Sequence, residues 1–184
     1  GNIYYKSSIN QLILGGVFFL CIWANIDNIM LILHSLSPKF SGGRYVVFFI
    51  ALARIVYLIS GVNSSIIINS KYYKFDLLSN IPFLIFIVIT NHILIPSNWE
   101  VMGISISGIN GAAFATFLST FLFFTIKIVF VYIKFKIHPF SINTIKTIIL
   151  LLVIYLIISN INLSFNLYSD IILKSGIILL IFIP

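Results

Sequence analysis

Residues 109–133 form the run INGAAFATFLSTFLFFTIKIVFVYI, in which Lys127 is the single charged side chain. A helix needs about 20 apolar residues to cross the hydrocarbon core of a bilayer. In hydrocarbon the backbone N–H and C=O groups must bond one another within the segment, as they do in a helix. The run lacks the alternation of polar and apolar residues that is typical of strands in membrane barrels. It therefore predicts a membrane-spanning helix.

Five further apolar segments surround this run and predict spans of the same kind. The six predicted spans cover residues 9–33, 45–68, 77–95, 109–133, 142–158 and 171–184. We therefore expect an all-α fold, a polytopic transmembrane helical bundle of six spans within residues 1–184. The chain begins with Gly1 and stops at Pro184 directly after an apolar run, so we expect it to be a fragment of a larger chain.

The composition is that of a chain solvated by lipid. Charged residues make up 8% of the chain and hydrophobic residues 60%, whereas soluble domains carry about 25% charged residues. A net charge of +7 is compatible with nucleic-acid binding, but the basic residues are scattered singly between apolar runs. Cys21 is the only cysteine, which excludes an internal disulfide and a cysteine-based metal site. We expect membrane lipid as the surroundings and no nucleic acid as a partner.

The basic residues also predict an orientation. Cytoplasmic loops of membrane proteins carry an excess of Lys and Arg. The side of the bundle that includes the amino-terminal end holds Lys6, Lys71, Lys74, Lys134, Lys136 and Lys146, and the other side holds Lys39 and Arg44. We therefore expect a multi-pass membrane protein with the amino-terminal end of the chain in the cytoplasm. Trp99 falls near a span end on the outward side, where an interfacial anchor belongs.

Arg54 lies near the middle of the second predicted span. A charge there costs roughly 2.5–3.5 kcal/mol on insertion scales. Tyr57, Gly61 and Ser64 follow at helical spacing, so the four residues are predicted to share one polar helix face. In one interpretation this face lines a cavity and Arg54 binds an anionic substrate, with Tyr57 and Ser64 beside it. In the other, Arg54 is structural and pairs with an acid or with carbonyls of a neighbouring helix.

Four other charged residues lie in or beside the predicted spans. Asp27 ends the first predicted span, where it is a candidate ion-coupling residue or a partner for Arg54, or else an interfacial cap. Lys127 is expected to extend its ammonium group to the cytoplasmic headgroups, with substrate contact as the alternative. Asp170 and Lys174 form an i,i+4 pair that we expect to be structural.

Small residues in the fourth predicted span indicate a packing face. Rows of small residues at spacing four let membrane helices approach closely. The two rows are Gly111, Ala115, Ser119 and Ala112, Thr116, Thr120. In the third span Pro82 predicts a kink, because proline leaves a backbone carbonyl without its donor.

No catalytic motif is present. His34, His92 and His138 fall near span ends in separate loops, and no zinc-protease, phosphate-loop or nucleophile-elbow motif occurs. We expect no enzymatic activity, no catalytic residue, no metal and no cofactor.

Three stretches resemble a known family. They are SINQLILGGVFFLCIWANIDNIMLIL (residues 8–33), VVFFIALARIVYLISGVNSSIIINSKYYKFDLL (residues 46–78) and GINGAAFATFLSTFLFFTIKIVFVYIKFKIHPFS (residues 108–141). They are similar to polysaccharide biosynthesis proteins of the O-antigen flippase type, in the multidrug/oligosaccharidyl-lipid/polysaccharide exporter superfamily. The resemblance covers the chain to about residue 141 and fades in the last two spans. An acidic residue often stands in the family where Tyr57 stands here.

The resemblance implies a two-lobe transporter of which this chain is the carboxy-terminal lobe. The implied function is to move undecaprenyl-diphosphate-linked oligosaccharide units from the inner to the outer leaflet of the bacterial inner membrane, for surface polysaccharide biosynthesis. The implied partners are that lipid-linked oligosaccharide and an amino-terminal lobe of the same chain. Two alternatives remain open, a multidrug or small-molecule exporter of the same superfamily and an accessory or structural membrane subunit. A glycan polymerase or acyltransferase would need a large outward loop or a His/Asp pair, and the sequence has neither.

Overall fold

The computed structural model describes residues 2–36, 42–101, 103–160 and 167–182. Its elements in chain order are α1 (Asn2–Ala24), α2 (Ile26–Leu36), α3 (Arg44–Ile68), α4 (Tyr73–Leu94), β1 (Trp99–Val101), β2 (Ile104–Ile106), α5 (Gly108–Phe135), α6 (Ile142–Ser159) and α7 (Leu167–Phe182). The predicted all-α class is confirmed, and a short hairpin between α4 and α5 is the one departure among the described residues.

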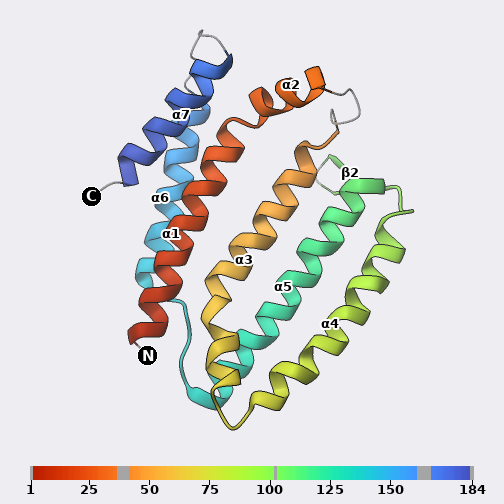
Figure 1. Ribbon diagram of the computed structural model, residues 1–184, viewed down its shortest axis with the longest axis vertical. Coiled ribbons are helices and arrows are strands. Elements are labelled where there is room, and N and C mark those ends of the chain that lie inside the picture. The colour runs from red at the N-terminus through yellow and green to blue at the C-terminus, as the bar shows by residue number, and fades with distance from the viewer. Residues whose placement is uncertain (1, 37–41, 102, 161–166, 183–184) are drawn as a thin grey trace.

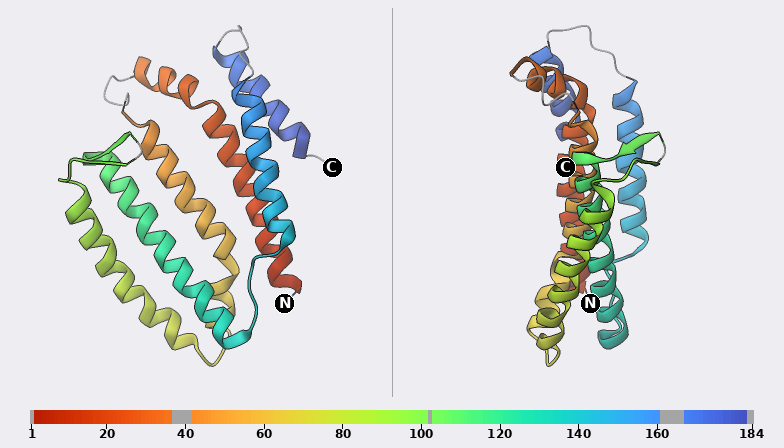
Figure 2. Two further views of the ribbon diagram at one scale, coloured as in Figure 1. Left: turned by 180° about the vertical axis from the view of Figure 1, so that it is seen from behind. Right: turned by 90° about the vertical axis from the view of Figure 1, so that its right-hand side faces the viewer.

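The long helices form a layer that is one helix thick over most of its width. α1 packs against α3, α3 against α5, and α5 against α4, in that order across the layer (Figure 1). α6 and α7 pack against α1, and α6 lies off the plane of the layer on one face of α1 (Figure 2). The protein therefore has two broad faces, and α6 covers only the α1 end of one of them.

Apolar side chains cover much of this surface. On α4 alone the exposed large apolar side chains include Leu77, Leu78, Ile81, Leu84, Ile85, Val88 and Ile89. Soluble monomers rarely expose an apolar surface of this extent. Acyl chains solvate such a surface, and the helices satisfy their own backbone groups. The chain is therefore a multi-pass membrane protein.

Of the described helices, four are long and apolar enough to cross a bilayer, at residues 4–24, 73–94, 108–135 and 142–159. α3 is a fifth if its two segments, Arg44–Ser60 and Val62–Ile68, count as one span despite a bend of 45° between them. The sixth predicted span corresponds to α7, which has 16 residues and is shorter than the about 20 that a perpendicular span requires. Residues 183 and 184 of that prediction lie outside the described residues, as does Lys39.

The structure divides the first predicted span, residues 9–33, at Asn25. α1 begins earlier, at Asn2, and ends at Ala24, and the chain continues as the separate helix α2. The buried Asn25 donates from Nδ2 to the Cys21 carbonyl, at 2.8 Å, and to Ser175 Oγ on α7, at 3.1 Å. Asparagine side chains that bond nearby backbone carbonyls compete with the regular helix. The apolar run thus continues past the point where the helix stops.

The segment that connects α4 to α5 has secondary structure of its own. It folds into the antiparallel hairpin β1–β2, with Trp99 opposite Ile106 and Gly103 at a φ of +78° in the turn. Ile106 is fully buried against Leu94 and Ala115. The hairpin therefore covers the end at which α4 and α5 meet.

The predicted packing face of the fourth span is confirmed for its first row. Gly111, Ala115 and Ser119 are buried, and Ser119 Oγ lies 3.1 Å from Thr90 Oγ1 on α4. Gly111 sits so close to α4 that an added Cβ would lie 2.4 Å from the Leu94 carbonyl oxygen. Because a backbone atom occupies that space, only glycine allows this approach.

We expect Gly111→Ala to destabilise the protein by about 1–3 kcal/mol, because α4 and α5 must move apart to admit the methyl group. The midpoint of thermal unfolding in detergent measures the effect. Gly176→Ala is the matched control, since a Cβ at Gly176 on α7 meets nothing within 4 Å. Equal midpoints for the two variants would contradict the close approach.

Candidate functional site

A buried ion pair joins α5 to α4. Lys127 Nζ lies 2.7 Å from Asp76 Oδ1, and the two side chains are 3% and 12% exposed. The same ammonium group donates to Ser64 Oγ on α3, at 2.8 Å. Taking two charges out of water costs several kcal/mol for each ion, which close pairing and further hydrogen bonds offset. One lysine thus connects three helices.

Aromatic rings surround the rest of the ammonium group. Lys127 Nζ lies 4.3 Å from the ring centroid of Phe123 and 5.9 Å from that of Phe124. The negative face of an aromatic ring attracts a cation, more strongly where water is absent. The prediction that Lys127 extends to the cytoplasmic headgroups is therefore wrong, because a carboxylate and two rings hold it inside the bundle.

A second set of polar contacts lies on the other side of α3. The Tyr4 hydroxyl of α1 donates to Asn63 Oδ1, and both residues are buried. Ser8 and Ser60 are buried close by in sequence, and Ser8 Oγ and Asn63 Nδ2 have no hydrogen-bond partner among the described residues. Residues 60–64 of α3 therefore carry polar contacts both to α1 and to the ion pair. The 45° bend of α3 falls in this same stretch.

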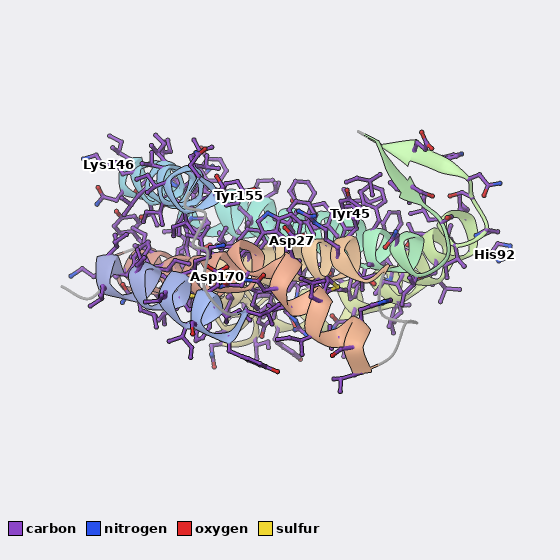
Figure 3. The ribbon with its side chains drawn as sticks, turned by 90° about the horizontal axis from the view of Figure 1, so that it is seen from above. Asp27, Tyr45, His92, Lys146, Tyr155 and Asp170 are labelled. Carbon is purple, nitrogen blue, oxygen red and sulfur yellow. The ribbon has the colours of Figure 1, made fainter. Side chains whose placement is uncertain are left out.

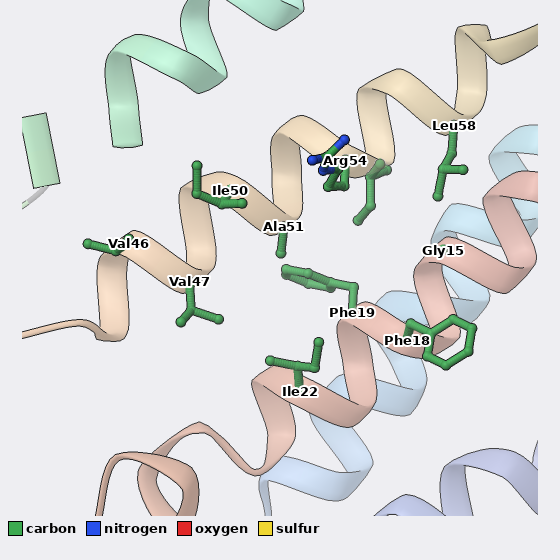
Figure 4. Close-up of a pocket in the computed structure, with 11 residues that line it drawn as sticks. Gly15, Phe18, Phe19, Ile22, Val46, Val47, Ile50, Ala51, Arg54 and Leu58 are labelled. Atoms are coloured by element: carbon green, nitrogen blue, oxygen red, sulfur yellow. The ribbon is translucent and has the colours of Figure 1, made fainter. Parts of the chain in front are cut away.

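Arg54 lies on an exposed face of α3, nearer the amino-terminal end of this helix than residues 60–64. It borders a groove of about 420 Å³ between α1 and α3 (Figure 4). The remaining lining is apolar and includes Phe18, Phe19, Ile22, Ile50, Ala51 and Leu58. α6 packs on the opposite side of α1, where Gly16 meets Leu151. Within the described part of the chain, this groove is open and Arg54 forms no ion pair.

The structure brings two of the three predicted substrate-binding residues together. Tyr57 is exposed on the same face of α3 as Arg54 and packs its ring edge-on against Phe124, with centroids 5.4 Å apart. Ser64 instead turns toward α5, where it accepts the hydrogen bond of Lys127. The polar face proposed for α3 is therefore not continuous, because Ser64 turns toward α5 while Arg54 and Tyr57 are exposed. A substrate contact by these three residues stays a prediction.

Asp27 lies at the other end of the bundle from the Lys127 pair. It forms an ion pair with Arg44, at 2.8 Å, and both side chains are exposed. Arg44 also lies over the ring of Trp23, 5.4 Å from its centroid. Asp27 is thus not a partner of Arg54, and its position at the start of α2 fits the interfacial interpretation. Its proposed role in ion coupling stays a prediction.

The same end also contains the predicted pair of Asp170 and Lys174. The pair forms, at 3.0 Å. Asn28 Nδ2 donates to Asp170 Oδ2, at 2.7 Å, which joins α2 to α7. Figure 3 views the bundle from this end, with Asp27 and Asp170 labelled on their two helices. These contacts support the structural interpretation of the pair.

The ion pair of Lys127 and Asp76 is the feature that sequence reasoning missed. Its signal was present, because Lys127 stands inside the fourth predicted span and Asp76 stands one residue before the third. Asp76 is in the first turn of α4 and Lys127 is two turns before the end of α5, and those helix ends lie at the same end of the bundle (Figure 1). Pairing opposite charges that lie at a similar depth in neighbouring helices would have predicted this contact.

The fold and the buried charges define an all-α, multi-pass membrane protein in which buried polar contacts join α1 to α3 and α3 to α5 and α4. Among the described residues, no three His, Cys, Asp or Glu side chains gather in a way that would hold a metal ion. No family model, curated protein or solved structure matches the chain.

We expect Lys127→Met to destabilise the protein by about 3–5 kcal/mol, because it leaves the Asp76 carboxylate buried without its partner. The double variant Lys127→Met/Asp76→Leu is expected to regain most of that loss. Thermal unfolding of the purified protein in detergent measures both.

Arg44→Met is the control for this comparison, because its ion pair is exposed and worth less than about 1 kcal/mol. A double variant that is less stable than Lys127→Met would contradict the account of the pair.

Proposed function

We propose that the protein is the carboxy-terminal lobe of a two-lobe flippase, which moves undecaprenyl-diphosphate-linked oligosaccharide across the bacterial inner membrane. One observation carries the proposal. Arg54 is an exposed cation near the middle of α3, on a face that no other described helix covers.

The cost of a charge in hydrocarbon supports a wet surface at this position. Arginine near the bilayer centre faces a bundle interior or a water-filled cavity rather than acyl chains. The groove that Arg54 borders between α1 and α3 is open among the described helices, which leaves room for a water-filled cavity there. A second lobe facing Arg54 would close that cavity.

The groove beside Arg54 matches the chemistry of a lipid-linked diphosphate. A diphosphate cannot cross hydrocarbon alone, because the cost of burying unpaired charge is prohibitive. A guanidinium group offsets that cost with charge-assisted, often bidentate, hydrogen bonds to phosphate oxygens. Tyr57 adds a hydroxyl group on the same face, and the apolar groove wall can contact the first isoprene units of the tail.

The course of the chain supports six spans with the amino-terminal end in the cytoplasm. The amino-terminal end of α1, the α3–α4 turn and the α5–α6 connection lie at one end of the bundle (Figure 1). The lysines predicted to be cytoplasmic belong to these segments or to the helix turns next to them. α7 then serves as a tilted or shortened sixth span.

The second candidate is a small-molecule exporter of the same superfamily. Arg54 would repel a cationic drug. The groove instead combines one cation with an apolar wall. This pattern favours an amphiphilic anion. An accessory membrane subunit is the remaining alternative, and it would not require Arg54.

We expect Arg54→Ala to abolish surface polysaccharide while the protein stays in the membrane at its normal level. The reason is loss of the cation that binds the diphosphate. The measurement is surface polysaccharide in a strain that depends on this gene, together with the amount of the protein in isolated membranes.

Arg44→Ala is the matched control, since it removes an exposed arginine from the end of the same helix. It should leave the polysaccharide unchanged. Normal polysaccharide in the Arg54→Ala strain would refute the proposal, and loss of drug resistance with normal polysaccharide would favour the exporter.

A further inference from the structure

A patch of basic and aromatic side chains lies at the α3–α4 turn. Lys71 Nζ and Lys134 Nζ both lie over the ring of Tyr72, 5.2 Å and 5.5 Å from its centroid. The two lysines are exposed, and Lys74 and Lys136 are exposed nearby in sequence. Two ammonium groups therefore lie within 6 Å of the centre of a single tyrosine ring.

The acidic residues of the chain do not neutralise this patch. The chain has four acidic side chains, and three of them pair with other cations, Asp27 with Arg44, Asp76 with Lys127, and Asp170 with Lys174. The fourth, Glu100, belongs to strand β1 at the far end of α4. The lysines of the patch must find their counter-charge outside this chain.

An apolar groove begins beside the patch and runs between α4 and α5. It has a volume of about 480 Å³, and its lining includes Phe75, Leu78, Pro82, Phe83, Leu122 and Ile126. Phe75 stacks on Phe130, with centroids 3.7 Å apart, and Phe130 meets the edge of Tyr72, at 5.7 Å. The rings thus connect the basic patch to the groove without a break.

The length of the groove suits an acyl chain. Its lining on α4 extends from Phe75 to Phe86, which spans about 16 Å at 1.5 Å per residue. Tyrosine and lysine at a span end lie at the depth of lipid headgroups. Phosphate at the patch and an acyl chain in the groove would therefore occupy their natural depths.

We propose that this surface binds an anionic phospholipid of the bilayer. Its phosphate lies between Lys71 and Lys134 against Tyr72, and one acyl chain follows the α4–α5 groove. The site is distinct from the Arg54 groove, which lies between α1 and α3, and it does not depend on the transported substrate.

The test is native mass spectrometry of the intact, delipidated protein in detergent with defined lipids. We expect phosphatidylglycerol to be retained at least about tenfold better than phosphatidylcholine, since two lysines supply the attraction. Lys71→Gln/Lys134→Gln should remove that preference. Lys6→Gln/Lys146→Gln removes the same charge from exposed positions at the same end of the bundle and should keep it.

A second comparison tests the groove. Leu78→Trp obstructs it and should lower phosphatidylglycerol retention severalfold, whereas Leu84→Trp, on α4 with the same exposure but outside the lining, should not. Equal retention of the two lipids, or equal effects of the two lysine pairs, would overturn the proposal. So would retention of a polyprenyl phosphate without phosphatidylglycerol, or displacement of the lipid by an equal concentration of inorganic phosphate.

Discussion

The structure depends on one constraint, that a charge inside a bilayer must find a partner or water. Lys127 and Asp76 meet it by pairing with each other, and Ser64 completes the contact from a third helix. The pair replaces the large apolar core of a soluble protein as the specific contact among α3, α4 and α5. Apolar packing alone distinguishes poorly between helix neighbours in lipid, because acyl chains are as apolar as leucine. The ion pair and the close contact at Gly111 therefore define which helices are adjacent.

The same constraint gives the exposed surfaces of α3 and α4 different surroundings. Between Ile81 and Ile89 the exposed side chains of α4 are all apolar and need only acyl chains. The exposed face of α3 carries Arg54 and Tyr57, and a guanidinium group there requires water or an anion. The bend of α3 and the polar contacts of residues 60–64 follow this face toward the carboxy-terminal end of the helix. If the protein is the transporter proposed above, α3, with both polar contacts and a bend, is the element best placed to move.

The sequence predicted those features that depend on one helix at a time. Length and hydropathy identified the segments of α3 to α6 to within a few residues, and spacing four identified the row of Gly111, Ala115 and Ser119. Features that depend on contacts between distant residues were missed. Asn25 ends α1 through a bond to Ser175, and Ile106 folds the hairpin by packing on Leu94. The direction of the Lys127 side chain was also missed, because it is decided by Asp76 on another helix.

The most direct test compares the water accessibility of the exposed surfaces of α3 and α4. In a Cys21→Ser background, Tyr57→Cys places a thiol on the α3 face and Val88→Cys places one on α4, at residues that are 46% and 67% exposed. Maleimides react with the thiolate, which forms in water and not in hydrocarbon. In native membranes, the account predicts rapid labelling at position 57 and none at position 88. Equal labelling at both positions, or labelling at position 88 alone, would contradict it.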